Sequence, residues 1–67
     1  MLNAIKKARL IAGVTQSELA AMIGVTPGAV SQWEQGTTKP AVRKLKPLAI
    51  ALHTTVEKLL EGEERVV

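Results

Sequence analysis

Apolar residues recur three and four positions apart along the whole chain, and no stretch alternates apolar and polar positions for long enough to predict a strand. Glycine, threonine and proline residues interrupt this pattern about every eight to twelve positions. We therefore expect an all-α fold of five short helices. A chain of 67 residues can enclose only one small core, so we expect one domain.

The first helix is expected over residues 3–12, with Asn3 as its N-cap and Gly13 as its end. Ile5 and Ala8 share one face of this segment, while lysine and arginine side chains surround the rest. The segment is therefore predicted to be amphipathic and to cover the core on one side.

The second helix is expected to open at Thr15. The hydroxyl of Thr15 can accept the amide three residues on, while the carboxylate of Glu18 reaches back to the amide of Thr15. This reciprocal arrangement is a capping box. Gly24 is the predicted end of the helix, since glycine readily adopts the left-handed conformation found there.

The third helix is expected to begin after Thr26 as N-cap, with Pro27 in its first position and Gly36 at its end. Only residues 24–26 separate it from the second helix. A connection that short with a glycine at the left-handed position forces a sharp angle between the two helices. The pattern is typical of a helix-turn-helix.

The fourth apolar-periodic segment covers residues 42–52 and contains Pro47. Inside a helix proline deletes a hydrogen bond and clashes with the carbonyl four residues back. We therefore expect this helix to begin late, with Pro47 in its first turn and residues 40–44 irregular.

The fifth helix is expected over residues 56–61 and to end at Gly62. Its cap is predicted to be Thr55, or alternatively Thr54 with Glu57 as a capping box.

The helix-turn-helix domain is accordingly expected to cover residues 1–62, followed by a frayed tail at 63–67.

Charge is distributed unevenly. Residues 1–53 hold seven Lys/Arg and two Glu, while residues 54–67 hold two Lys/Arg and four Glu. A regional basic excess suits a polyanion, although on a short chain such an excess is more often an ordinary solvated surface. No apolar run is long enough to predict a membrane span or a signal peptide.

The titratable residues do not suggest catalysis or metal binding. The chain has no cysteine, no aspartate and a single histidine, His53, which we expect in a turn. We therefore predict no enzyme activity, no metal site, no cofactor and no small-molecule substrate. The absence of cysteine suits a reducing compartment, and we expect a cytoplasmic protein.

The second and third helices are predicted to pack through one face each, with Ala20 at their closest crossing. Trp33 is expected in this core rather than in a ligand site. The inward residues are Leu19, Ala20, Ile23, Val30 and Trp33.

The outward face of the third helix is uncharged, which suits reading of base edges in a DNA groove. Gln32 is the strongest candidate because its amide can pair bidentately with adenine. Ser31 can contact several bases, and Gly28 permits close backbone approach beside Pro27. The alternative for these residues is a solvated helix face.

The sequence resembles the helix-turn-helix domains of the lambdoid phage repressors and Cro proteins and of their bacterial relatives. The resemblance runs from Ile5 to Leu60. It is carried by Arg9-Leu-Ile-Ala-Gly-Val-Thr-Gln-Ser-Glu-Leu-Ala, by Ile23-Gly-Val-Thr-Pro-Gly-Ala-Val-Ser-Gln-Trp-Glu-Gln-Gly and by Leu48-Ala-Ile-Ala-Leu.

This resemblance implies a compact five-helix fold like that of lambda repressor, with the third helix as recognition helix. It implies that Gln16 and the opening amides of the second helix meet a DNA phosphate. It implies that Lys39, Arg43 and Lys44 hold the DNA backbone and that Arg9 pairs with Glu34. For Lys39, Arg43 and Lys44 the alternative is ordinary surface solubility. For Arg9 and Glu34 the alternative is a pair of exposed charges that contributes almost nothing.

The function implied is a sequence-specific regulator of transcription, a Cro-type repressor that binds duplex DNA as a homodimer at a palindromic operator. The alternative is an antitoxin-like autorepressor whose main partner is a toxin protein.

Overall fold

The computed structural model describes residues 3–64, with side chains for residues 3–60, and the helices in this range are five in number. They are α1 (Ala4–Ala12), α2 (Gln16–Ile23), α3 (Pro27–Gln35), α4 (Val42–Ala51) and α5 (Val56–Glu64). The predicted all-α, five-helix fold is confirmed. None of these helices is both long and apolar enough to cross a bilayer.

The N-caps of the first three helices are those that the sequence predicts. Asn3 Oδ1 accepts the amide of Lys6 at 2.9 Å, and Thr26 Oγ1 accepts the amide of Ala29 at 3.1 Å. Both bonds of the capping box at Thr15 and Glu18 are present, at 3.0 and 2.8 Å. Each cap satisfies amides that have no partner inside their own helix.

The turn between α2 and α3 depends on Gly24, which has a φ of 75°. In this left-handed conformation its amide donates to the carbonyl of Ala20, and the amide of Val25 donates to the same oxygen at 3.0 Å. A side chain would strain the backbone here. The glycine therefore lets α2 stop and α3 leave at a steep angle.

The core receives buried side chains from all five helices and from the residue that ends α4. Trp33 is 7% exposed and Ala20 is 1% exposed, so the predicted core positions are confirmed. α2 packs on α3 and α4, and α1 packs on α3 and α5. The buried apolar residues are Ile5, Leu19, Ala20, Ile23, Val30, Trp33, Leu48, Ala49, Leu52 and Leu59.

The predicted late start of α4 is wrong. The helix begins at Val42 and carries Pro47 in its interior, so residues 42–44 are helical. Pro47 removes one hydrogen bond, to the carbonyl of Arg43, and both residues are exposed, where water can replace the missing donor. Burial of Leu48 on the other side of the helix offsets the cost.

The predicted end of α5 at Gly62 is also wrong, because the helix continues to Glu64. Glycine inside a helix costs only about 1 kcal/mol relative to alanine, which is too little to end it. The N-cap is Thr55, the first of the two alternatives, whose Oγ1 accepts the amide of Lys58 at 3.1 Å. Of the expected tail, residues 65–67 lie outside the described part of the chain.

The turn from α4 to α5 contains His53, the one non-glycine residue with positive φ among residues 3–64. Its φ of 56° is left-handed, and the amide of Thr54 donates to the carbonyl of Ala49 at 2.9 Å as the chain turns. An L residue with a side chain adopts this conformation at a cost. His53 thus occupies a helix-end position of the kind that glycine fills after α1, α2 and α3.

Candidate nucleic-acid interface

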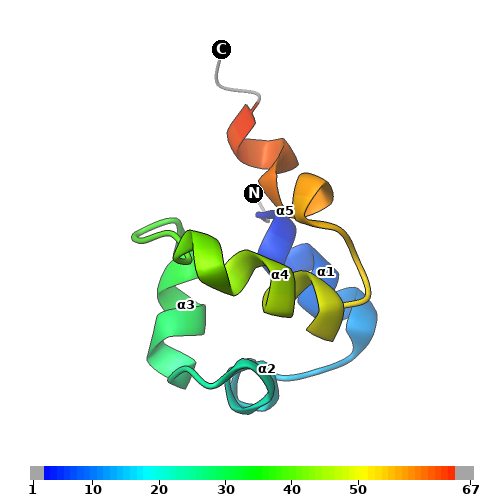
Figure 1. The fold of residues 1–67 in the computed structure, drawn as a ribbon. Helices are drawn as coiled ribbons and strands as arrows, with labels where there is room; N and C mark the ends of the chain where they lie inside the picture. Colours follow the sequence, from blue (N-terminus) through cyan, green and yellow to red (C-terminus); the bar gives the residue numbers. More distant parts are fainter. Residues whose placement is uncertain (1–2, 65–67) are drawn as a thin grey trace.

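α3 lies at one edge of the molecule, with its outer side turned away from the other helices (Figure 1). Val30 and Trp33 point into the core, which leaves Gly28, Gln32 and Gln35 exposed on the other side of the helix. Pro27 is exposed at the start of α3. The exposed face contains no charged side chain.

Ser31 and Gln35 form a hydrogen-bonded pair on this face, one helical turn apart. Gln35 Nε2 donates to Ser31 Oγ at 3.0 Å. The serine oxygen therefore serves as an acceptor within the protein, and its own hydroxyl proton remains available to donate outward. The pair therefore offers a hydroxyl donor beside the exposed amide of Gln32.

Gly28 is a glycine that the fold does not need. A Cβ built at this position meets only Thr26 Oγ1, at 3.9 Å, which is an ordinary contact. Neither strain nor crowding therefore explains the missing side chain, which contrasts with Gly24 and its positive φ. Its effect is to leave the backbone at the start of α3 open to close approach.

Arg9 of α1 and Glu34 of α3 form the expected ion pair. Arg9 Nε lies 2.6 Å from Glu34 Oε2, and Arg9 Nη2 lies 3.1 Å from Glu34 Oε1. Their side chains are only 11% and 3% exposed. The third guanidinium nitrogen, Nη1, donates to the carbonyl of Val14 at 2.9 Å, so the pair ties α3 both to α1 and to the loop before α2.

Gln16 joins this pair, because its Nε2 donates to Glu34 Oε1 at 3.0 Å. Burial would raise the pKa of the Glu34 carboxyl, but the hydrogen bonds from Arg9 and Gln16 and the charges of Arg9 and Lys6 lower it below its usual 4.5. The hydrogen bond to Glu34 raises the pKa of Arg9, against the effect of burial. The folded state therefore favours both charges.

The lowered pKa of Glu34 gives its interactions a defined pH range. They stabilise the fold fully above the usual value of 4.5 and are lost as the pH falls through the lower folded-state pKa.

Gln16 also opens α2, where its own amide and that of Ser17 precede the amide bound by the cap and have no partner within the helix. These amides and the positive end of the helix dipole could receive an anion. The side-chain amide of Gln16, by contrast, is directed to Glu34. In the structure the Gln16 side chain and the opening amides of α2, which the family resemblance assigns together to phosphate binding, thus have different directions.

The three residues that are expected to hold the DNA backbone differ in their exposure and contacts. Lys39 is exposed in the connection between α3 and α4, and Arg43 is exposed in the first turn of α4. Lys44 is half-buried, and its Nζ donates to the carbonyl of Ile23 at 3.3 Å.

A further interhelix bond that sequence reasoning missed begins at Asn3. Besides capping α1, Asn3 donates from Nδ2 to the carbonyl of Trp33, near the end of α3, at 2.5 Å. The bond from Lys44 to Ile23 and the bond from Gln16 to Glu34 were also missed. All three join residues at least 18 positions apart, and no local pattern marks them.

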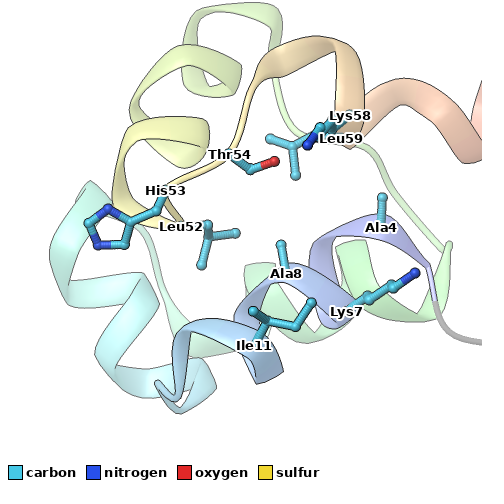
Figure 2. A pocket seen from close by; sticks show the side chains of 9 residues that line it. All are labelled: Ala4, Lys7, Ala8, Ile11, Leu52, His53, Thr54, Lys58 and Leu59. Atoms are coloured by element: carbon cyan, nitrogen blue, oxygen red, sulfur yellow. The ribbon is translucent and has the colours of Figure 1, made fainter.

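A hollow of about 520 Å³ lies on another part of the molecule, lined by α1, the α4–α5 turn and α5 (Figure 2). Ile11, Leu52 and Leu59 contribute apolar surface, and Lys7 and Lys58 contribute cations. No residue of α2 or α3 lines it. Among the described residues, no group of three or more histidine, aspartate or glutamate side chains could hold a metal ion.

Comparison with known proteins gives one family, described as helix-turn-helix, whose match covers residues 5–59. The transcriptional activator BcrR of Enterococcus faecalis is 36% identical over 53 residues, which are 79% of this chain and 26% of BcrR. Repressor protein C2 of Salmonella phage P22 is 38% identical over 50 residues, which are 75% of this chain and 23% of that protein.

An uncharacterised helix-turn-helix transcriptional regulator of Archaeoglobus fulgidus is 39% identical over 50 residues, which are 75% of this chain and 22% of that protein. The chain thus spans about a quarter of the length of these curated relatives.

Among solved structures, the crystal structure of the P22 c2 repressor in complex with a synthetic operator is similar to this chain. The TM-score is 0.81 and the sequence identity 36%, and the match covers 87% of this chain and 88% of the repressor chain. The likeness therefore extends over most of the five-helix unit.

Proposed function

Since the chain belongs to the helix-turn-helix family of DNA-binding transcriptional regulators, we propose that it is a sequence-specific repressor that reads a palindromic operator as a homodimer. In this proposal α3 enters the major groove of duplex DNA. The family is a class of DNA-binding regulators and not of enzymes, and the proposed place of action is the cytoplasm.

The observation that carries the proposal is the contrast between the two faces of α3. Its inner face is held by Val30, Trp33 and the buried Glu34, whereas its outer face is exposed, polar and uncharged. Such a face can form hydrogen bonds with base edges, while cationic side chains outside the helix contact the DNA phosphates. The similar P22 c2 repressor was crystallised with operator DNA, which supports the same partner here.

Base reading is assigned first to Gln32. Its exposed amide carries one donor and one acceptor group, the combination that pairs bidentately with adenine in the major groove. Ser31, whose oxygen already accepts from Gln35, is assigned as a donor to an acceptor such as N7 or O6 of guanine. Pro27 and Gly28 allow the backbone to come close to the DNA.

Phosphate contacts are assigned to the α2 N-terminus and to the cations that follow α3. The amides of Gln16 and Ser17 point out of the positive end of α2, where a phosphate oxygen can accept them. Lys39 and Arg43 are both exposed and lie after the recognition helix. Together they give the complex its salt dependence.

Dimerisation is part of the proposal because one small module buries too little surface for a tight specific site. Two recognition helices placed about 34 Å apart would enter successive major grooves on one side of the duplex. The operator is then a repeat related by a twofold axis.

The experiment is selection of duplexes from a random pool, followed by fluorescence anisotropy at two salt concentrations. We expect salt-sensitive binding and an enriched motif with twofold symmetry. Enrichment of an asymmetric single site would overturn the dimer. Absence of binding at low salt would overturn the DNA proposal and favour a protein partner.

A further inference from the structure

Lys44 carries a positive charge at a position of its helix where positive charge is unfavourable. It lies in the first turn of α4, which contains Arg43 and no acidic residue. The positive end of a helix dipole destabilises cations in that turn. No acidic side chain in the first turn of α4 offsets this cost.

The group that the Lys44 ammonium meets is the carbonyl of Ile23, the last residue of α2, at an Nζ to O distance of 3.3 Å. Carbonyls at the end of a helix have no partner within it and carry the negative end of its dipole. α2 has no basic residue in its own last turn. Lys44 thus supplies from α4 the cation that α2 lacks.

The position of this bond matters because Ile23 adjoins the turn of the helix-turn-helix. Gly24 follows directly, and α3 starts three residues later. α4 packs mainly on α2 and α5, so its influence on α3 passes through α2. A link from α4 to the last residue of α2 fixes the point from which α3 departs.

We propose that Lys44 is a positioning residue, which holds the end of α2 and thereby the angle of α3, and does not contact DNA phosphate. Lys44 is half-buried, and its charged end is directed to the carbonyl of a residue that is 8% exposed. Arg43 is exposed in the same turn and is the cationic residue of this turn that we assign to a DNA phosphate. The proposal rests on the proposed function only where DNA binding is measured.

The first test is made without DNA. Lys44→Met keeps the apolar stem and removes the ammonium, and Lys46→Met removes an exposed charge from the same helix as the matched control. We expect Lys44→Met to lower Tm by about 4–8 °C and to shift the amide resonances of Gly24 and Val25. Lys46→Met should do neither, and Lys44→Arg should restore both.

The second test compares binding to the selected operator and to random duplex at a temperature where all variants are folded. We expect Lys44→Met to weaken operator binding on the order of tenfold, corresponding to 1.4 kcal/mol, relative to Lys46→Met. Random-duplex affinity should match that of the control, and the salt slope should not change. Removing a phosphate contact would instead reduce that slope by about 0.9.

The outcomes separate the two proposals. A reduced salt slope with unchanged Tm and unchanged Gly24 and Val25 resonances would overturn the positioning role and make Lys44 a phosphate ligand. No change in any measurement would also overturn it. If the unaltered protein fails to bind DNA, the proposed function fails, while the shifts in Tm and in the amide resonances still decide whether Lys44 holds α2.

Discussion

The first half of the molecule, residues 3–36, and the second half, residues 37–64, differ in how well their helix ends match the residues that usually cap and end helices. In the first half every helix has its side-chain N-cap and ends at a left-handed glycine. In the second half α4 has no side-chain cap and contains a proline, and the turn after it contains a left-handed histidine. The half that holds α3, the proposed recognition helix, is thus the one in which local signals and fold agree.

The two halves differ in what fixes the orientation of their helices. The angle between α2 and α3 is specified by a three-residue turn, by caps on both sides and by the bonds of Arg9, Glu34 and Gln16. α4 is fixed by the burial of Leu48 and Ala49 against the rest of the core. Apolar packing tolerates a poor local sequence, whereas a steep interhelix angle depends on defined bonds.

The largest effect is expected where the first half is most tightly bonded. Arg9→Met leaves the nearly buried carboxylate of Glu34 without its cation, and we expect a loss of about 3 kcal/mol in the free energy of unfolding. Urea denaturation measures it. The double variant Arg9→Met/Glu34→Leu should recover most of the loss, and an equally large loss in both variants would show that the charges are not paired in solution.

In the second half, Pro47→Ala should stabilise the protein by about 1–2 kcal/mol. Alanine restores the missing hydrogen bond and removes the clash with the preceding turn, although the unfolded chain gains freedom. Thermal unfolding of this variant beside Lys46→Ala, an exposed neighbour, measures the difference. A destabilised Pro47→Ala would mean that the proline assists the helix and that the contrast between the halves is overstated.

His53→Gly should stabilise the turn by about 1 kcal/mol, because glycine adopts a φ of 56° without strain. His53→Ala is the control, since alanine retains the Cβ that causes the strain. We expect only the glycine variant to raise Tm. An equal rise in both would point to the imidazole and not to the backbone.

The smallest effect is expected at Gly28, the glycine of the first half that does not have a left-handed φ and whose added Cβ would make only an ordinary contact. Gly28→Ala should raise the free energy of unfolding by about 0.5–1 kcal/mol, since helical alanine loses less conformational freedom on folding. Gly24→Ala is the contrasting variant and should destabilise, because its φ is 75°. Circular dichroism melts of the two compare them, and a destabilised Gly28→Ala would indicate a structural need at that position.

Sequence reasoning succeeded where the determinants are local. Thr15, Thr26 and Gly24 act within a few residues of their own position, so their spacing predicts the helix-turn-helix directly. It failed at Pro47 because the packing that keeps this proline in a helix comes from residues distant in sequence. At Gly62 a local signal was too weak to end the helix.

The candidate site could likewise be predicted from the sequence only in part. The outward face of α3 follows from helical periodicity once Val30 and Trp33 are assigned to the core, and the ion pair of Arg9 and Glu34 follows from the family resemblance. The direction of the Gln16 and Lys44 side chains depends on tertiary packing. The family resemblance suggests phosphate binding for both residues but does not show these directions.

The central claim, that the neutral outer face of α3 reads DNA sequence, is tested most directly by the operator-to-random affinity ratio of Gln32→Ala. We expect this ratio to fall by about 5- to 100-fold, as loss of one bidentate base contact predicts, while affinity for random duplex stays the same. Thermal unfolding should be unchanged, since the side chain is exposed. An unaltered ratio in a folded variant would contradict the assignment of Gln32 as base reader.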